Sequence, residues 1–185
     1  AELRQSFFND TATTEKARQI DVALRAEKRT QEPVDLVPAV EDRLAALERA
    51  NPEACVEADL PEEALVHADW LLGSVLDNVV ENTVVHSTDS PTLTVEVDVD
   101  GGTTLLRITD DCPTIPATEL DVFEAGVETP LQHSRGVGLW LVIWVVESYG
   151  GAVSFGTTPD GGNVVTLEFR TARWLSRRRV SNPVS

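Results

Sequence analysis

The chain has 185 residues, which is enough for one well-buried domain and too few for two domains of ordinary size. Hydrophobic residues make up 42% of it and charged residues 25%, a balance that excludes wholesale disorder and a collagen-like or disulfide-rich class. The 31 acidic residues outnumber the 15 basic ones, and the resulting net charge of -16 argues against a nucleic-acid partner, which requires a basic surface.

The acidic excess predicts a protein from a salt-adapted cell, because high salt screens the repulsion between like charges. The two cysteines, Cys55 and Cys112, lack metal-ligand spacing, and this favours a reduced cytoplasmic compartment. No apolar stretch reaches the roughly 20 residues that a membrane-spanning helix requires. The chain contains no methionine, so we expect it to be part of a longer protein.

The first half of the chain predicts helices with one short strand between them. Residues 2–29 show an amphipathic helical pattern, and residues 34–50 predict a second helix with one apolar face formed by Leu36, Val40, Leu44 and Leu47. Residues 55–58 predict a short strand. Residues 65–86 then carry a long apolar helical pattern that ends in a polar turn.

The second half begins with a predicted hairpin. Residues 92–99 alternate, with Leu93, Val95, Val97 and Val99 expected to point inward, and residues 104–108 return after a Gly-Gly turn. Residues 111–135 are rich in proline, glycine and polar side chains. A loop of this length inside a compact domain is usually functional, and we expect it to act as a lid.

A buried helix and a second hairpin complete the predicted fold. Residues 138–149 are apolar on nearly every side, and residues 152–155 and 163–169 predict two strands around a Pro-Asp-Gly-Gly turn. The order of elements predicts a two-layer α/β sandwich, in which helices cover one face of a mixed sheet, with an additional N-terminal helix.

Asn78 and Asn82 are the first candidates for chemistry. They lie four residues apart on one face of the helix predicted over residues 65–86, among apolar neighbours. Amide oxygens are hard, neutral ligands that suit Mg²⁺. Taken alone, the pair is better explained as two amides on a helix surface.

Two further segments have a chemical interpretation. Asp110 and Asp111 follow a strand, where a carboxylate can accept a hydrogen bond from an exocyclic amine such as that of adenine. Residues 135–139 enter the helix of residues 138–149 through two glycines, so their backbone N–H groups could receive phosphate oxygens. Each segment alone is also explained more simply, as an acidic turn and as a tight joint between loop and helix.

Together, in this order, the segments resemble the histidine-kinase ATPase superfamily, whose fold is shared by gyrase, mismatch-repair and chaperone ATPases. Residues 77–82 are similar to its asparagine box, residues 110–116 to its first glycine box and residues 134–139 to its second. Residues 128–133 followed by 136–142 are similar to sensor kinases of haloarchaea. The resemblance covers residues 34–170 and implies the ATP-binding fold of the Bergerat type.

The resemblance also implies the role of each site residue, with ATP and Mg²⁺ as cofactors. Asn82 would bind Mg²⁺, while Asn78 would be the catalytic residue and a neighbouring metal or phosphate contact. Asp110 would accept from adenine and Ile115 would line the adenine pocket. The residues expected around the phosphates are Arg135, Gly136, Val137, Gly138 and Leu139.

The position of Asn78 favours a kinase over an ATPase. The ATP-hydrolysing branches of the superfamily hold a glutamate there to activate water, and an amide cannot act as that base. We therefore expect the chain to be the catalytic domain of a two-component sensor histidine kinase. Residues 1–30 would be the last helix of a dimerisation and phosphoacceptor hairpin, 34–170 the ATP-binding domain and 171–185 a tail.

The implied partners are the kinase's own dimerisation domain, as a homodimer in the full-length protein, and a response regulator. The expected location is the cytoplasm, which includes the cytoplasmic part of a membrane-bound sensor. None of the three histidines lies on the helix predicted over residues 2–29, so the phosphoacceptor would belong to a missing helix. Alternatively, that helix packs on its own domain.

Departures from the family pattern keep other functions open. Cys112 and Thr114 stand where the first glycine box has glycines, and Ser134 replaces the first glycine of the second box. One alternative is therefore a degenerate nucleotide-binding or interaction module without kinase activity. Another is a serine kinase of the anti-sigma type on the same fold.

Overall fold

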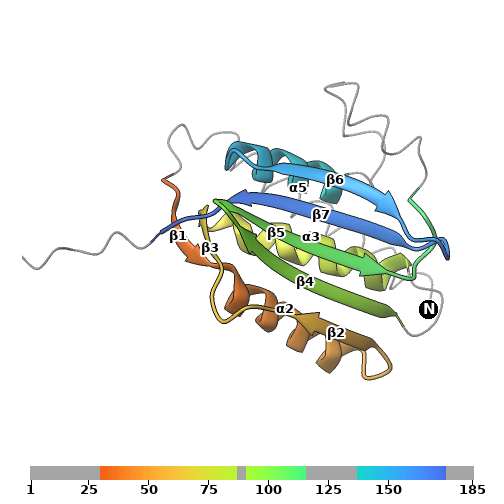
Figure 1. Ribbon diagram of the computed structural model, residues 1–185. Helices are drawn as coiled ribbons and strands as arrows, with labels where there is room; N and C mark the ends of the chain where they lie inside the picture. The colour runs from red at the N-terminus through yellow and green to blue at the C-terminus, as the bar shows by residue number, and fades with distance from the viewer. Residues whose placement is uncertain (1–29, 87–90, 116–136, 174–185) are drawn as a thin grey trace, which may run out of the picture.

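A computed structural model describes residues 30–86, 91–115 and 137–173, so the helix predicted over residues 2–29 lies outside the described residues. Three helices cover one face of a five-stranded sheet, which confirms the predicted two-layer α/β sandwich (Figure 1). The helices are α2 Leu36–Ala50, α3 Leu71–His86 and α5 Val137–Ser148. The strands are β1 Glu32–Asp35, β2 Cys55–Asp59, β3 Leu65–Ala68, β4 Thr92–Asp100, β5 Thr103–Asp110, β6 Ala152–Thr157 and β7 Asn163–Arg170.

The large sheet has the strand order β2-β4-β5-β7-β6. The first pair is parallel and the other three are antiparallel, so the sheet is mixed, as predicted. Both predicted hairpins are present. Gly101 and Gly102 turn β4 into β5 with φ values of 56° and 119°, a backbone conformation that favours glycine.

The helices and the inner face of the sheet enclose one hydrophobic core. Leu106 and Leu167 from the sheet and Leu71 and Leu141 from the helices are fully buried there. Each such side chain contributes roughly 1.5–3 kcal/mol to folding by leaving water. Val99 lies on the same face of β4 as Val97, but it is 42% exposed, so the expectation that it contributes to the core is wrong.

The start of the predicted helix over residues 34–50 is wrong by two residues. Val34 and Asp35 belong to β1, and α2 begins at Leu36. The Asp35 side chain ends the strand and caps the helix, because its Oδ1 accepts from the backbone N–H of Val37 at 3.1 Å and from that of Ala64 at 3.0 Å.

The start of the long helix predicted over residues 65–86 is also wrong. Its first four residues form β3, which pairs antiparallel with β1 in a separate two-stranded sheet. Helix α3 begins only at Leu71, whose N–H donates to Asp69 Oδ1 at 2.9 Å. A short apolar run has no periodicity that separates a buried strand from a buried helix.

The described chain continues slightly beyond β7. Thr171 pairs with Val66, and the N–H of Ala172 donates to the carbonyl of Leu65 at 2.7 Å. These contacts continue the pairing with β3 past residue 170, and the division of the chain into domains stays a prediction. Among the described helices, none is both long and apolar enough to span a membrane.

Candidate functional site

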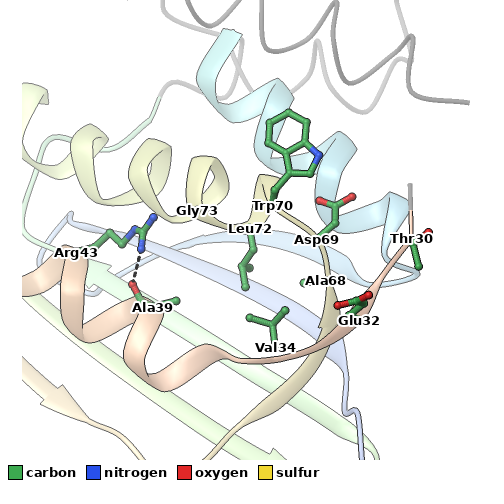
Figure 2. Close-up of a pocket in the computed structure, with 10 residues that line it drawn as sticks. All are labelled: Thr30, Glu32, Val34, Ala39, Arg43, Ala68, Asp69, Trp70, Leu72 and Gly73. Carbon is green, nitrogen blue, oxygen red and sulfur yellow. Dashed lines mark hydrogen bonds between the residues drawn. The ribbon is translucent and has the colours of Figure 1, made fainter. Parts of the chain in front are cut away.

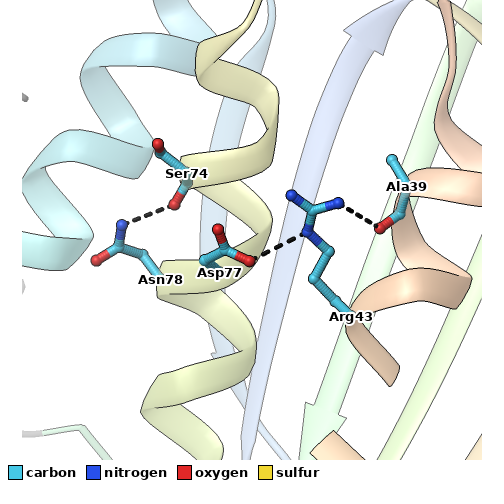
Figure 3. A network of polar contacts seen from close by, with 5 residues as sticks. All are labelled: Ala39, Arg43, Ser74, Asp77 and Asn78. Atoms are coloured by element: carbon cyan, nitrogen blue, oxygen red, sulfur yellow. Dashed lines mark hydrogen bonds and ion pairs between the residues drawn. The ribbon is translucent and has the colours of Figure 1, made fainter. Parts of the chain in front are cut away.

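Helix α3 presents opposite faces to its two neighbouring helices. On one side, Asp77 Oδ1 accepts from Arg43 Nε of α2 at 3.1 Å (Figure 3). Asn78 points the other way, toward α5 (Figure 3). The ion pair is half exposed and contributes at most about 1 kcal/mol. The Arg43–Asp77 pair is therefore mainly an orienting contact, which helps to fix the face of α3 that is turned toward α5.

Asn78 is buried and incompletely bonded. Its side chain is 2% exposed, and Nδ2 donates to the carbonyl of Ser74 at 2.7 Å. Its Oδ1 is buried without a hydrogen-bond partner among the described residues. A buried acceptor left unpaired costs about 1–3 kcal/mol, so this oxygen fits a ligand that binds an amide oxygen. The interpretation as a surface amide is wrong for Asn78, whereas Asn82, one turn later, is half-buried.

Asp110 is the last residue of β5, where the chain leaves the sheet. Its Oδ1 accepts two hydrogen bonds, from the backbone N–H of Cys112 at 3.0 Å and from Asn163 Nδ2 at 2.8 Å. The neighbouring Asp111 is exposed and accepts from the backbone N–H of Thr92 at 3.0 Å. The two carboxylates therefore differ, because only Asp110 is tied to the interior.

Cys112 brings α3 and the segment after Asp110 together. Its buried Sγ donates to the carbonyl of Thr83 at 3.0 Å, and Thr83 directly follows Asn82. A residue two positions after the predicted adenine acceptor thus contacts the helix turn of the predicted metal ligand. Asp110 and Asn82, the residues predicted to bind adenine and Mg²⁺, therefore lie on adjoining segments.

The pKa of the Cys112 thiol is raised from 9.0 to about 12, first by burial and then by the negative charges of Asp110 and Asp111 and a hydrogen bond with Asp110. A raised pKa means that the protonated thiol stabilises the fold fully below the unfolded pKa. We expect the free energy of unfolding to lose this contribution as pH rises from 9.0 to about 12. Urea unfolding of the unaltered chain and of Cys112→Ala across this pH range measures it. An equally steep decline in Cys112→Ala would contradict the assignment.

Asn163, the first residue of β7, is a site residue that the sequence analysis did not identify. Its backbone lies opposite Asp110 in the pairing of β5 with β7, which explains how its amide reaches that carboxylate. Nδ2 also lies 3.4 Å and 3.3 Å from the carbonyl oxygens of Cys112 and Pro113. Its Oδ1 accepts from the backbone N–H of Ile115 at 2.8 Å. One buried side chain therefore holds the whole 110–115 segment.

The predicted phosphate-binding residues are only partly described. Arg135 and Gly136 lie outside the described residues, and Val137 begins α5. Gly138 and Leu139 are buried in the first turn of that helix. The first N–H groups of a helix lack partners within the helix and favour negative charge, so the start of α5 is suited to an anion.

One hollow in the described residues does not coincide with the predicted site. It measures about 480 Å³ and lies on the α2 side of α3, where Figure 2 shows Arg43, Asp69 and Gly73 around it. Asn78 lies on the other side of α3, about 7.5 Å further along the helix than Gly73. None of the residues predicted to bind ATP or Mg²⁺ lines this hollow, whereas Asn78 Oδ1 is buried and has no hydrogen-bond partner among the described residues.

A second hollow of about 250 Å³ adjoins the 110–115 segment. Its lining includes Ile115 and Asn163, with Phe155 from β6. Ile115 is therefore beside a cavity, as its predicted role requires, although its contact with adenine stays a prediction. Among the described residues, no group of three or more His, Cys, Asp or Glu side chains could hold a metal ion.

The chain is similar to known proteins in sequence. The family model for histidine kinase-, DNA gyrase B- and HSP90-like ATPases matches residues 69–173. The sensor histidine kinase CitA of Klebsiella pneumoniae is 31% identical over 117 residues, which cover 62% of this chain and 21% of CitA. The sensor protein KdpD of Escherichia coli strain K12 is 30% identical over 125 residues, covering 63% of this chain and 14% of KdpD. The chain thus spans about a fifth or less of these relatives.

Solved structures share the fold. The mycobacterial sensor histidine kinase MprB superposes with a TM-score of 0.64 at 27% identity, covering 76% of this chain and 97% of that one. The Acinetobacter baumannii histidine kinase AdeS gives a TM-score of 0.69 at 22% identity, covering 94% and 86%. At that identity, the second likeness supports the fold alone.

Proposed function

The chain belongs to the family of histidine kinase-, DNA gyrase B- and HSP90-like ATPases and carries its ATP-binding catalytic domain, and on this premise we propose that it works in a sensor histidine kinase. The proposed reaction transfers the γ-phosphoryl group of ATP to a histidine on a dimerisation helix. The observation that supports it most is the buried Oδ1 of Asn78 on the α5 side of α3, which has no hydrogen-bond partner in the described part of the chain.

Asn78 and Asn82 are the proposed ligands of Mg²⁺. Bound Mg²⁺ would neutralise charge on the phosphates during transfer. The Asn78 amide is neutral and far too weak a base to take a proton from water, so it cannot activate water as a carboxylate base does. Its role is to orient, since Nδ2 is held by the Ser74 carbonyl and the position of Oδ1 is thereby fixed. Without a base for water, the γ-phosphoryl group is kept for a protein acceptor.

Asp110 is the proposed acceptor for the adenine amino group. Two donors hold its Oδ1, and a carboxylate has a second oxygen with which to accept. The first turn of α5, from Val137 to Leu139, is proposed to receive phosphate oxygens, together with Arg135 and Gly136. The departures at Cys112 and Thr114 do not leave the segment loose, because both side chains are hydrogen-bonded.

The proposed setting follows from the same assignment. Residues 1–30 would contribute to a dimerisation hairpin in a homodimer, and a response regulator would receive the phosphoryl group. The proposed location is the cytoplasm, including the cytoplasmic part of a membrane-bound sensor. The net charge of -16 supports operation in high salt, where self-repulsion is screened.

A phosphoryl-transfer assay tests this function. The chain is mixed in molar salt with a dimerisation hairpin that carries the acceptor histidine, Mg²⁺ and ATP labelled on its γ-phosphate. We expect acid-labile, alkali-stable label on the hairpin, and we expect Asn82→Ala to lose at least about 90% of it, since one metal ligand is removed. ATP binding without any transfer would favour the degenerate module, and label on a serine would favour the anti-sigma type of kinase.

A further inference from the structure

The turn between β6 and β7 supports the 110–115 segment from a neighbouring strand. Thr114 Oγ1 donates to the carbonyl of Gly161 at 2.6 Å. Gly162 lies so close to the backbone carbonyl of Asp110 that a Cβ at this position would collide with it. Asn163 follows directly and bonds to both ends of the segment. A turn outside all three recognised motifs therefore holds the residue proposed to bind adenine.

The orientation of the Asn163 amide is determined by its surroundings. Nδ2 faces three oxygens, from the Asp110 carboxylate and from two backbone carbonyls, while Oδ1 faces the N–H of Ile115. The reversed amide would place its oxygen against those three acceptors and its NH₂ group against a donor. The side chain is 5% exposed, so water cannot take over these contacts cheaply.

The consequence for Asp110 is a fixed carboxylate. Both donors, the Cys112 N–H and Asn163 Nδ2, bond to Oδ1, and no hydrogen bond from the described residues reaches Oδ2. The Cys112 donor belongs to the same segment and moves with it. Asn163 is the donor from another strand, so it ties the carboxylate to the sheet.

We infer that Asn163 is a positioning residue that makes this site select adenine over guanine nucleotides, by holding the Asp110 carboxylate so that Oδ2 faces the base. The inference rests on the proposed function. Adenine carries an amino group at the position where guanine carries a carbonyl oxygen. A fixed, ionised acceptor attracts the first and repels the second, whereas a carboxylate free to turn away loses this contrast.

Titration calorimetry of the full chain with non-hydrolysable ATP and GTP analogues and Mg²⁺ tests the inference. For Asn163→Ala we expect ATP affinity to fall about tenfold, with GTP affinity changed by less than about twofold, so the ratio of the two affinities falls about tenfold. Asn51→Ala is the matched control, because its Nδ2 bonds to the Leu47 carbonyl at the end of α2. It should lower stability and leave the ratio unchanged.

Asn163→Asp separates positioning from simple loss of structure. It keeps the acceptor for the Ile115 N–H but sets a carboxylate against Asp110, and two adjacent carboxylates raise the pKa of one of them. As pH falls, one proton shared by the two carboxylates restores a hydrogen bond between residue 163 and Asp110. The ratio of ATP affinity to GTP affinity should therefore recover in this variant and stay constant in the unaltered chain. The other titratable groups at this place are Asp111, which bonds to Thr92, and Cys112, whose pKa of about 12 keeps it protonated at acidic and neutral pH. Phosphate titration affects both nucleotides alike and cancels in the ratio.

The outcomes distinguish the two proposals. An unaltered chain that binds neither analogue overturns both the proposed function and this inference. An unaltered chain that binds ATP and GTP equally, or an Asn163→Ala variant that loses both affinities in proportion, overturns the inference alone.

Discussion

Replacing Asp110 with asparagine is expected to lower the affinity for ATP by at least tenfold, or about 1.5–3 kcal/mol. The amide can keep one oxygen toward the N–H of Cys112 and Asn163 Nδ2, which hold Oδ1 in the unaltered chain. Its NH₂ group then takes the place of Oδ2 and meets the adenine amino group as a second donor. The fold of Asp110→Asn should be largely preserved, because the amide oxygen still accepts both internal hydrogen bonds.

Asp111→Asn is the matched control for this prediction. Asp111 is the next residue, carries the same charge, and accepts from Thr92 at the exposed start of β4. Calorimetric titration of both variants with an ATP analogue should show a loss for Asp110→Asn and a change of less than about twofold for Asp111→Asn. Equal losses would show that only the local negative charge matters.

Gly162→Ala is expected to destabilise the domain by about 3 kcal/mol or more and to weaken ATP binding as well. The new Cβ would collide with the backbone carbonyl of Asp110, which cannot move without displacing the end of β5. Since this carbonyl belongs to the proposed adenine acceptor, the relief of the collision should turn the carboxylate out of place. Urea unfolding and titration with an ATP analogue measure the two effects.

Gly151→Ala provides the control with the same collision elsewhere. There the Cβ would meet the backbone carbonyl of Glu168, near the end of β7 that lies away from the 110–115 segment. Both variants should lose similar stability, and only Gly162→Ala should lose ATP affinity in its folded fraction. If Gly151→Ala weakened binding as much, the role of the β6–β7 turn in the site would be contradicted.

The large sheet could be predicted from the sequence because its signals are local. Leu93, Val95 and Val97 alternate with polar residues in β4, and glycines with positive φ follow directly in the turn to β5. The apolar face of α2 and the almost uniformly apolar α5 are equally local patterns. Each of these elements is specified within its own window of sequence.

The small sheet could not be predicted in this way. Pro33 lies opposite His67 in β1 and β3, and nothing near either residue indicates the other. Both strands have four residues, and each is followed by a helix within a few residues. Their apolar residues were therefore assigned to the start of that helix. The pairing is a tertiary effect that overrides local preference.

The candidate site shows the same division. Asn78, Asn82 and Asp110 could be proposed as site residues because they lie in recognisable sequence motifs. Asn163 gave no such signal, since an asparagine after a Gly-Gly turn is an ordinary turn residue. Its importance arises only from pairing with Asp110 across two strands that are 53 residues apart in sequence.

The central claim is that one pocket joins the amide oxygens of α3 to the carboxylate that ends β5, and that Mg²⁺ and ATP bind there together. Calorimetric titration of the unaltered chain with an ATP analogue in molar salt, with and without Mg²⁺, tests this most directly. The account predicts binding of one nucleotide per chain that weakens at least about tenfold when Mg²⁺ is removed. Absence of binding in the presence of Mg²⁺, or the same affinity without it, would contradict the account.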